Sequence, residues 1–510
     1  MYIKMANKFF FMMPLLMIFC SYKGKTTEDD FLTVGKTIEV KATKNIGKER
    51  NATTTVTAGK AKPVKINAKQ DSPEFYFNVL GSNELQLDAV AKKSKFVVET
   101  NVDFKVVSSK PDWCKPEIKP DEESNLVIHI ADNFDSKAER KAEVTISADG
   151  FDPVTVQVTQ RGWVWRVGVY YFDGWAGHYY KEQDKAWMAA NVSNAPTHLT
   201  RRMVEEFPGR EPIWGWRDDS QVIMEQQIDL AADNGVDFFL FCWYWADDNG
   251  PININQINSM STHTSLDLYM KARNKDRVRF GLLIANHEGG FITGPDNWEA
   301  GVNFWTQYFN DPQYVTVDGK PLLVIFNTEG LVGDTDGVDN GCITRMQETA
   351  KKAGFKDGLS IAGSGWWAKY PEKRRGLTHC THYNINKGYG DGAESHSYDE
   401  LIMAYKEQWG AFEGRPYIPV LGCGWDERPW QTPGGREGWY FPDSTPEKFK
   451  QFLLDAVQWM KDNPTKTPRE KMALVYAWNE LGEGGYLVPT KADPNAAKLK
   501  MIKSVVEGNY

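Results

Sequence analysis

The sequence predicts a multidomain protein in which one or two N-terminal all-β sandwich modules precede an α/β (β/α)8 TIM barrel. Three observations predict this fold class. Residues 36–162 contain short runs in which apolar and polar residues alternate, as in strands with one buried face. Residues 163–510 contain longer apolar runs separated by amphipathic segments, and aromatic residues become dense there. The length of 510 residues is sufficient for two or three domains.

Residues 1–20 are predicted to be a signal peptide. Two lysines precede an apolar run of 11 residues, which is too short to span a bilayer but has the length of a signal-peptide core. Cys20 and a polar tether at 21–35 follow, and this order resembles a bacterial lipoprotein signal in which the cysteine is lipidated. Phe19 departs from that pattern, which usually has a small residue before the cysteine. We expect an exported protein, either an outer-membrane or periplasmic lipoprotein anchored through Cys20 or a secreted protein.

The all-β region contains an internal repeat. Residues 49–70 align without gaps with residues 139–160. Identical pairs include Arg50 and Arg140, Pro63 and Pro153, and Gln70 and Gln160. Each copy has the order strand, turn ending at proline, strand. We therefore expect a short or truncated sandwich module at 36–71 and a second module at 72–162.

The second module resembles a known domain type. Its closing hairpin, residues 140–146 and 153–160, and its central Asp112-Trp113 are similar to BACON-type immunoglobulin-like domains. That resemblance implies a domain that precedes a catalytic domain in secreted glycan-degrading bacterial enzymes. It leaves two roles open, carbohydrate binding and spacing.

Eight near-continuous apolar runs after Trp163 predict buried parallel strands with helices between them. The predicted strands are 166–172, 236–245, 278–287, 321–327, 359–365, 379–385, 417–426 and 472–480. Segments with helical spacing lie near 220–234, 263–274, 296–310, 343–353, 398–412 and 446–462. Eight such units fit a barrel at 163–510, and an open doubly wound sheet is the alternative. No GxGxxG motif follows the first predicted strand, which argues against a dinucleotide site there.

Nearly every predicted strand ends in aromatic, amide or acidic residues. In a barrel these carboxyl ends meet on one face, and aromatic platforms with hydrogen-bonding groups are typical of a ligand cleft. The 19 Trp and 21 Tyr residues favour a carbohydrate-active protein, because aromatic faces stack on sugar rings. The predicted substrate-binding residues are Tyr171, Trp175, Trp216, Asp218, Trp243, Tyr244, Trp245, Asn286, Glu288, Trp366, Tyr383, Trp425, Asp426, Trp478 and Asn479.

The last predicted strand leads directly into two glutamates, Glu480 and Glu483, which stand three residues apart. A carboxylate pair suits hydrolysis of glycosidic bonds, because one group acts on the leaving oxygen and the other on the anomeric side. The alternative is a solvated acidic turn at the end of a strand. Seven other strand ends of similar composition favour the catalytic interpretation.

Five motifs of the barrel region resemble one known family. They are 169–175 (VYYFDGW), 214–220 (WGWRDDS), 241–245 (FCWYW), 424–426 (GWD) and 478–484 (WNELGEG). Together they are similar to the glycoside hydrolase family 99-like group, also called WbsX-like, over residues 165–490. Family 99 enzymes are (β/α)8 endo-acting α-mannosidases or mannanases, with two essential carboxylates in a Glu-x-x-Glu motif after the last strand.

The resemblance implies a role for each glutamate. Glu483 would be the general acid, and Glu480 would act as a base at the sugar 2-OH, through a 1,2-anhydro intermediate with net retention. Leu481-Gly482 departs from the family, which has bulky residues between the glutamates. The sugar-contact motifs of the mannosidases are not recognisable either. The wider group includes members described as glycosyltransferases and others as xylosidase/arabinosidase.

We therefore expect a glycoside hydrolase acting on a bacterial, plant or host glycan, with an α-mannoside as one candidate. The alternatives are a non-catalytic glycan-binding surface protein and a glycosyltransferase on the same fold. A net charge of −8 argues against a nucleic-acid partner, and we expect a monomer that meets a membrane only through a lipid anchor. Six cysteines without a CxxC or zinc-like spacing predict no bound metal, and we expect no cofactor.

Overall fold

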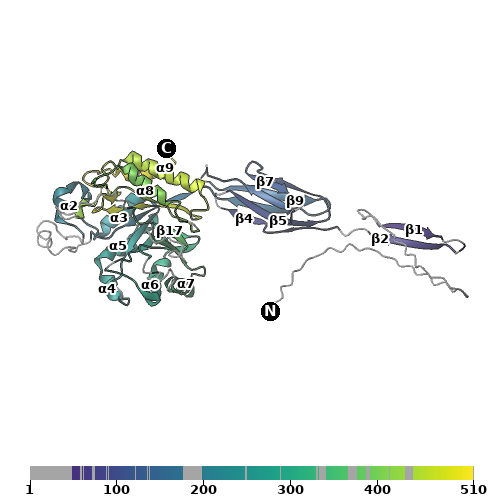
Figure 1. The fold of residues 1–510 in the computed structure, drawn as a ribbon, viewed down its shortest axis with the longest axis horizontal. Coiled ribbons are helices and arrows are strands. Elements are labelled where there is room, and N and C mark those ends of the chain that lie inside the picture. The colour runs from purple at the N-terminus through teal and green to yellow at the C-terminus, as the bar shows by residue number, and fades with distance from the viewer. Residues whose placement is uncertain are drawn as a thin grey trace. The chain divides into compact units, whose positions relative to one another are not determined.

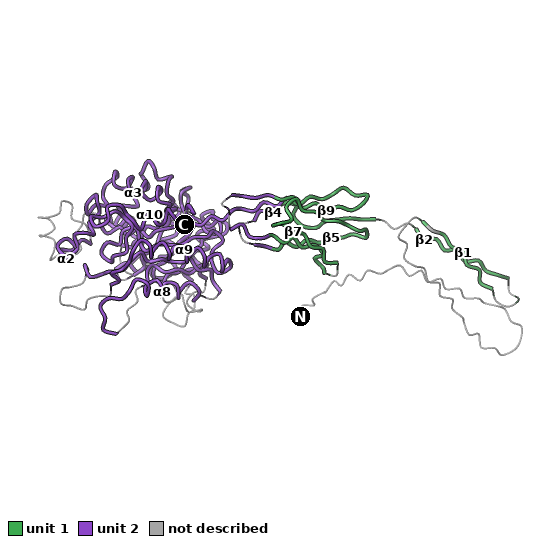
Figure 2. The backbone as a smooth tube through the Cα atoms, turned by 90° about the horizontal axis from the view of Figure 1, so that it is seen from above, with its two compact units in different colours: residues 1–84, 93–130, 142–157 green, residues 85–92, 131–141, 158–510 purple. Residues whose placement is uncertain are grey.

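The computed structural model describes residues 49–508 with gaps. The gaps are 58–59, 61, 72–74, 88, 90, 121, 135, 137, 176–197, 247–249, 288, 329–330, 332–340, 366–375, 386–390, 413 and 431–439. The predicted signal peptide with Cys20, the tether, Glu288 and Trp366 lie outside the described residues. The chain divides into two compact units, coloured in Figure 2. Unit 1 comprises residues 1–84, 93–130 and 142–157, and unit 2 comprises residues 85–92, 131–141 and 158–510.

The two copies of the sequence repeat each form a hairpin. In the first copy, β1 (Arg50–Val56) and β2 (Val64–Gln70) pair so that Arg50 lies opposite Gln70. In the second, Arg140 of β9 (Arg140–Ala148) donates from Nε to Oε1 of Gln160 in β10 (Val154–Gln160) at 2.9 Å. The repeated Arg and Gln are therefore register partners in the first hairpin and hydrogen-bonded in the second. Within the described residues of β1 and β2 no side chain is buried, so this part of the predicted short module is a hairpin without a core.

The second module consists of two four-stranded sheets, with strand orders β4-β10-β9-β6 and β3-β5-β8-β7. The remaining strands are β3 (Phe77–Leu80), β4 (Glu84–Leu87), β5 (Lys92–Thr100), β6 (Phe104–Ser108), β7 (Cys114–Ile118) and β8 (Leu126–Ile130). Burial alternates along the strands, with Val144 and Ile146 of β9 and Val156 and Val158 of β10 inside. This alternation is expected for sheets packed face to face. The predicted sandwich is confirmed.

Eight parallel strands form the barrel of unit 2, in the order β17-β16-β15-β13-β12-β11-β19-β18. They are β11 (Trp165–Tyr171), β12 (Phe238–Trp243), β13 (Arg279–Ile284), β15 (Lys320–Ile325), β16 (Ser360–Ser364), β17 (His379–Thr381), β18 (Val420–Gly422) and β19 (Lys471–Tyr476). A short strand, β14 (Thr316–Val317), pairs antiparallel with β15. Most of these strands are buried along their whole length, because the barrel interior covers one face and helices cover the other.

The two ends of this strand order meet and close the ring. Cys380 of β17 forms a parallel bridge with Tyr417, just before β18. The amide of Ile418 donates to the Cys380 carbonyl at 2.9 Å, and the Thr381 hydroxyl donates to the Ile418 carbonyl at 3.0 Å. The barrel prediction is therefore confirmed, and the alternative of an open doubly wound sheet is wrong.

Helices surround the strands, as Figure 1 shows. They are α2 (Arg201–Glu206), α3 (Gln221–Asp233), α4 (Ile254–Ser259), α5 (Thr264–Lys271), α6 (Gly294–Phe309), α7 (Cys342–Lys352), α8 (Tyr398–Gln408), α9 (Pro446–Asp462) and α10 (Ala497–Val506). Local sequence sets their ends. The Ser220 hydroxyl accepts from the Ile223 amide at the start of α3, and Gly235 takes a φ of 80° just after its end. Thr445 caps α9, and Pro446 occupies its first position.

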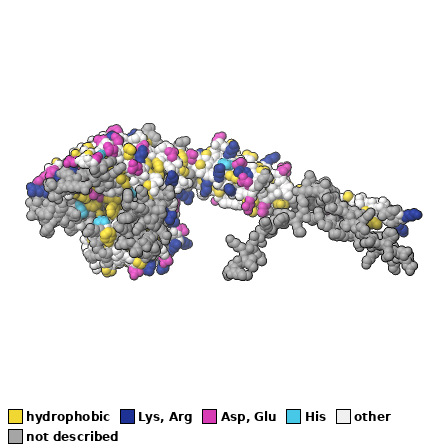
Figure 3. Space-filling view, viewed as in Figure 1, with side chains coloured by type: hydrophobic (Ala, Val, Ile, Leu, Met, Phe, Trp, Pro, Cys, Tyr) yellow, Lys and Arg dark blue, Asp and Glu magenta, His cyan; other side chains and the backbone are white. Residues whose placement is uncertain are grey.

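Three further observations concern the surface, the cysteines and the length of the helices. On the face shown in Figure 3, Lys and Arg side chains are interspersed with Asp and Glu side chains. The five described cysteines are buried, and no disulfide joins any two of them. No helix in the described part of the chain combines the length and the apolarity needed to cross a membrane.

Candidate active site

The last barrel strand continues into a small hairpin that brings the two glutamates together. β20 (Asn479–Glu480) pairs antiparallel with β21 (Gly485–Tyr486), and Glu480 lies opposite Gly485. The amide of Glu483 donates to the carbonyl of Glu480 at 3.3 Å, which closes the turn. Gly484 leaves it at a φ of 76°, which a residue with a side chain rarely adopts. We call residues 480–483 the acidic turn.

The two residues that precede the turn, Trp478 and Asn479, attach it to the barrel. The Asn479 side chain forms two hydrogen bonds with the backbone of Phe172. Its Oδ1 accepts from the Phe172 amide and its Nδ2 donates to the Phe172 carbonyl, both at 2.8 Å. Trp175 donates from Nε1 to the Asn479 carbonyl at 3.0 Å. Trp478 is fully buried and donates from Nε1 to Oε1 of Gln227 in α3 at 2.7 Å. The backbone leading to Glu480 is thereby held on both sides.

Each glutamate accepts a hydrogen bond from a tyrosine. The Tyr383 hydroxyl donates to Oε1 of Glu480, and the Tyr476 hydroxyl donates to Oε2 of Glu483. The two tyrosine rings pack edge to face with centroids 5.1 Å apart. Glu480 is 3% exposed, whereas Glu483 is partly exposed. The other Glu480 oxygen, Oε2, is buried without a hydrogen-bond partner among the described residues.

Burial dominates the acidity of this pair. It raises the pKa of Glu483 to about 7, opposed by the Tyr476 hydrogen bond and reinforced by the nearby Glu427. Burial and the charge of Glu483 raise the pKa of Glu480 well above its usual value, opposed by the Tyr383 hydrogen bond. Desolvation disfavours the charged form of a carboxyl group, so the pair retains at least one proton near neutral pH. A protonated carboxyl group at pH 7 is what general acid catalysis requires.

A second buried carboxyl pair lies at the ends of β11 and of the loop before α3. Asp173 accepts from the Ser265 amide at 2.6 Å through Oδ2. Burial raises the pKa of Asp173 to about 7, and burial with the charge of Asp173 raises the pKa of Asp218 well above normal. Oδ1 of Asp173 and Oδ2 of Asp218 are buried without a hydrogen-bond partner in the described part of the chain. Such unpaired buried acceptors are costly, which makes them candidates for binding ligand hydroxyl groups.

Two residues from other loops pack against the acidic turn. The Arg210 guanidinium lies beneath it and binds the carbonyls of Leu481 and Gly482. The Trp430 ring lies over Gly482, where a Cβ would be only 2.0 Å from Trp430 Cε2. Glycine at 482, where family 99 has a bulky residue, is therefore explained by the indole that occupies the space.

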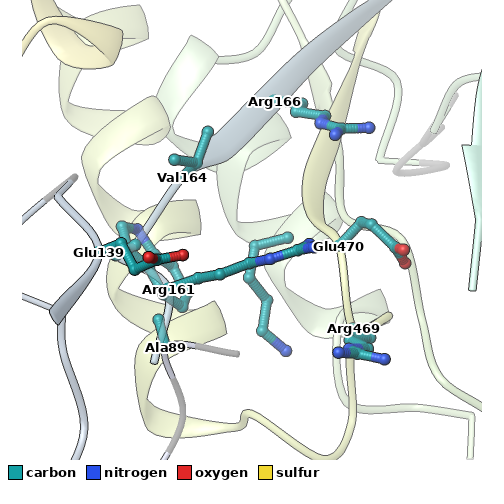
Figure 4. A pocket seen from close by; sticks show the side chains of 10 residues that line it. Ala89, Glu139, Arg161, Val164, Arg166, Arg469 and Glu470 are labelled. Atoms are coloured by element: carbon teal, nitrogen blue, oxygen red, sulfur yellow. The ribbon is translucent and has the colours of Figure 1, made fainter. Parts of the chain in front are cut away.

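Unit 2 also has a pocket at the opposite, amino-terminal ends of two barrel strands. Arg166 of β11 and Lys471 of β19 line it, and Figure 4 labels Arg161 and Glu470 among the other lining side chains. The Lys471 ammonium donates to the carbonyls of Pro464 at 2.8 Å and Pro468 at 2.9 Å, so its charge serves the fold. Barrel enzymes place their chemistry at the carboxyl ends of the strands. We therefore locate the candidate site at the acidic turn.

Family models match both parts of the chain. The model described as "Glycosyltransferase WbsX" matches residues 190–501, which is more than half of the chain. The chain belongs to the WbsX family. The BACON model, described as "Putative binding domain, N-terminal", matches residues 102–161. Both resemblances expected from the sequence motifs are confirmed.

Solved structures similar to this WbsX-family chain include glycoside hydrolases. A GH99 endo-alpha-mannosidase from Bacteroides thetaiotaomicron is 13% identical, with a TM-score of 0.44, over 68% of this chain and 97% of that chain. A Bacteroides ovatus GH5 xyloglucanase in complex with a XXXG heptasaccharide is 12% identical, with a TM-score of 0.37, over 85% of this chain and 100% of that chain. No curated protein matches the sequence.

The structure of this WbsX-family chain places the predicted substrate-binding residues in three groups. Tyr383 binds Glu480 directly, and the charges of both glutamates contribute to raising the pKa of the Tyr244 hydroxyl, after burial and Cys242. The residues of a second group are buried. They are Tyr171, Trp175, Trp216, Asp218, Trp243, Trp245, Asn286, Trp425, Trp478 and Asn479. Asp426 forms the third group, because both of its carboxylate oxygens accept from arginines. The substrate-binding role of all these residues stays a prediction.

Several groups at the site were missed by sequence reasoning. Tyr476 lay within an apolar run and had the pattern of a core residue. Gln227 lies on the buried face of α3, where it accepts from both Tyr171 at 3.1 Å and Trp478. Arg210 and Trp430 each end a 3₁₀ turn, in connections that carry no strand-end signal. Two acidic residues did have a sequence signal, because Asp173 lies in the VYYFDGW motif and Glu427 directly follows the GWD motif.

Proposed function

We propose that this WbsX-family protein is a glycoside hydrolase that cleaves an oligosaccharide or polysaccharide by acid/base catalysis with Glu480 and Glu483. The observation that carries the proposal is the pair of glutamates at the carboxyl end of the last barrel strand, each of which accepts a hydrogen bond from a tyrosine and has a pKa raised by burial. The pair requires no cofactor for this chemistry. An α-mannoside is the first substrate to test, because the Glu-x-x-Glu motif resembles that of family 99.

The chemical steps follow from the two carboxyl groups. Glu483 donates its proton to the leaving oxygen, and the anomeric C–O bond breaks with its electron pair on that oxygen. The sugar 2-oxygen forms a bond to the anomeric carbon as its proton passes to Glu480. Water then opens the 1,2-anhydro ring at the anomeric carbon and gives a proton to Glu483, while the 2-oxygen regains its proton from Glu480. The result is hydrolysis with net retention.

The ligand-free site raises a question about these roles. Glu480 is more deeply buried than Glu483, and burial with its neighbour's charge raises its pKa well above the usual value. Both carboxyl groups of the resting pair therefore have raised pKa values, whereas the mechanism needs the proton on Glu483 and Glu480 ionised. Hydrogen bonding of a sugar 2-OH to Glu480 would favour its ionised form and transfer the proton to Glu483. Glu483 is partly exposed, which suits a group that must reach the leaving oxygen.

Substrate contacts are proposed for the groups that line this end of the barrel. Tyr244 and Tyr383 are close to the carboxyl pair, and Asp173 and Asp218 offer buried acceptors without a partner among the described residues. Sugar hydroxyls would satisfy such acceptors. Trp430 offers an indole beside the acidic turn on which a sugar ring would stack.

The decisive experiment is hydrolysis of a glycan panel by the wild type and by Glu480→Gln and Glu483→Gln. Each substitution keeps the shape of the side chain and removes its acid/base function. Glu470→Gln is the matched control, because Glu470 accepts from the Asp318 amide at 2.8 Å at the other end of the barrel. The proposal is supported if Glu480→Gln and Glu483→Gln lose cleavage while Glu470→Gln retains it. Full cleavage by both of them would contradict it.

The family description favours one second candidate, a glycosyltransferase. Transfer requires a glycosyl donor, whereas hydrolysis requires only water. Product formation from glycan alone supports the hydrolase. Product that appears only with an added nucleotide sugar supports the transferase. Binding without either product would identify a glycan-binding protein.

We also propose export as a lipoprotein through Cys20. The support is the order of apolar run, cysteine and polar tether in the sequence. Full-length protein with Cys20→Ala should leave the membrane fraction in a bacterial host with lipoprotein processing. Equal membrane retention of both forms would contradict lipidation.

A further inference from the structure

Arg210 is a buried cation directly beneath the acidic turn. It ends a 3₁₀ turn, Pro208–Arg210, in the long connection between β11 and α3, and its side chain is 9% exposed. The Phe207 ring lies 5.0 Å from its guanidinium carbon. Burial lowers the pKa of Arg210, and the Asp426 carboxylate raises it. A guanidinium remains charged under these conditions, so its burial needs compensating contacts.

Those contacts are made to the acidic turn and to Asp426. Nη1 of Arg210 donates to the Leu481 carbonyl at 2.9 Å and contacts the Gly482 carbonyl at 3.4 Å. The same nitrogen donates to the Asp426 carbonyl at 2.9 Å, and Nη2 lies 2.5 Å from Asp426 Oδ2. The two carbonyls of the turn lie between the glutamates in sequence. One planar group thus holds the backbone that separates Glu480 from Glu483.

Asp426 completes a closed set of contacts. Its amide donates to the Glu483 carbonyl at 2.6 Å, so it holds the far end of the turn that Arg210 holds in the middle. Each of the three partners, Arg210, Asp426 and the turn, therefore contacts the other two. A lysine would supply a point charge but not the planar fork that serves several acceptors at once.

We propose that Arg210 is a positioning residue that sets the distance and burial of the Glu480–Glu483 pair through the carbonyls of Leu481 and Gly482. The inference rests on the proposed hydrolase activity for its kinetic consequence only. Its structural consequence is independent of activity. Release of the turn would admit water to Glu483, so the pKa of Glu483 would fall toward the usual value of a glutamic acid.

Arg428 offers a matched comparison. It donates from Nε to Asp426 Oδ1 at 2.8 Å and from Nη2 to Oδ2 at 2.9 Å, and its guanidinium lies 3.5 Å from the Tyr440 ring centre. In the described part of the chain it shares the Asp426 carboxylate with Arg210 but not the turn carbonyls. Replacing Arg428 removes an ion pair with Asp426, whereas replacing Arg210 removes an ion pair with Asp426 and also the hydrogen bonds to the turn.

The test compares Arg210→Ala, Arg210→Lys and Arg428→Ala in the full chain. The carboxyl pKa values of Glu480 and Glu483 are measured by ¹³C NMR titration of labelled glutamate, with assignments from Glu480→Gln and Glu483→Gln. Arg210→Ala should lower the Glu483 pKa by about one unit or more, and Arg428→Ala should leave it nearly unchanged. Arg210→Lys, which keeps a cation in place, serves if the alanine variant does not fold.

Kinetics provide the second measurement. Displacement of a reacting group by about 1 Å costs roughly 100-fold in rate, so Arg210→Ala should lower kcat by about that factor with little change in KM. Guanidinium ion at millimolar concentration should restore part of the rate of Arg210→Ala, whereas Arg428→Ala should gain less.

The outcomes separate the two proposals. A wild type that cleaves no glycan overturns the proposed function, while the NMR titration still decides the role of Arg210. Unchanged glutamate pKa values in Arg210→Ala and Arg210→Lys overturn the positioning role. Equal shifts of the Glu483 pKa in Arg210→Ala and Arg428→Ala also overturn it, because loss of an ion pair with Asp426 would then account for the whole shift.

Discussion

The hydroxyl of Tyr476 donates a hydrogen bond to Oε2 of Glu483, across the bend between the last barrel strand and the acidic turn. The donor comes from the final residue of β19, so the strand that delivers the turn also supplies one of its hydrogen bonds. A donor to a carboxylate favours the ionised form. Tyr476 thus moderates the rise in the pKa of Glu483 that burial causes.

Replacing that donor should shift the pH dependence of activity. In Tyr476→Phe the pKa of Glu483 should rise above about 7, because the hydrogen bond that lowers it is lost. The alkaline limb of kcat/KM against pH should move upward by about one unit, since the acid stays protonated to higher pH. Tyr398→Phe is the control, because the Tyr398 hydroxyl donates to the Gly422 carbonyl at 2.5 Å instead. A downward shift in Tyr476→Phe would contradict the assignment.

Stability should also depend on the protonation of Glu483. Its pKa is about 7 in the folded chain and near 4.5 when unfolded, so the folded state binds more protons between these values. The contribution of Glu483 is therefore fully present below about pH 4.5 and is lost as the pH rises through 7. Urea unfolding at intervals from pH 5 to 8 should show a shallower decline in Glu483→Gln than in the wild type.

Asp173 contributes in the same pH range, because burial raises its pKa to about 7 as well. Asp173→Asn should therefore also make the decline in the free energy of unfolding with pH shallower, whereas Glu470→Gln should leave that decline unchanged. An identical slope in the wild type and Glu483→Gln would show that Glu483 titrates normally.

The identity of the leaving group should distinguish the two glutamates. An aryl glycoside with an acidic phenol departs without protonation, whereas a sugar leaving group needs the general acid. Glu483→Gln should lose roughly 10² to 10⁴ in kcat on the natural glycan but retain most activity on the aryl substrate. Glu480→Gln should lose activity on both. If Glu480→Gln retained activity on the aryl substrate and Glu483→Gln lost activity on both, Glu480 would be the general acid. The greater burial of Glu480 is consistent with that alternative.

The close approach of Trp430 to Gly482 gives a prediction about packing. A Cβ at 482 would be 2.0 Å from Trp430 Cε2, so Gly482→Ala must displace the indole. Overpacking of this kind costs about 1–3 kcal/mol. In a Trp430→Ala background the same change should cost little, and urea unfolding of the four proteins in the cycle measures the difference. Equal costs in both backgrounds would show that the indole does not restrict residue 482.

The sequence determined the architecture of unit 2 well. Strands buried on both faces must be almost wholly apolar, so all eight barrel strands were predicted close to their observed positions, and Ser220 and Gly235 marked the ends of α3. The same pattern made Glu480 and Glu483 the catalytic candidates, because they stand where the last apolar run stops. The hairpin β1–β2 was predicted as part of a module, but its repeat pattern contained no information about how much of a core it would bury.

Only the tertiary structure decided which side chains act on the acidic turn. Arg210 lies more than 200 residues before the carbonyls that it binds, and Tyr383 reaches Glu480 from another strand end. An apolar run predicts a strand but does not distinguish a core tyrosine from one whose hydroxyl contacts a carboxylate, as Tyr476 does. Closure of the barrel brings these separate segments to one edge. Local periodicity thus predicts which segments are buried, whereas the partners of a buried polar group depend on contacts between segments far apart in the chain.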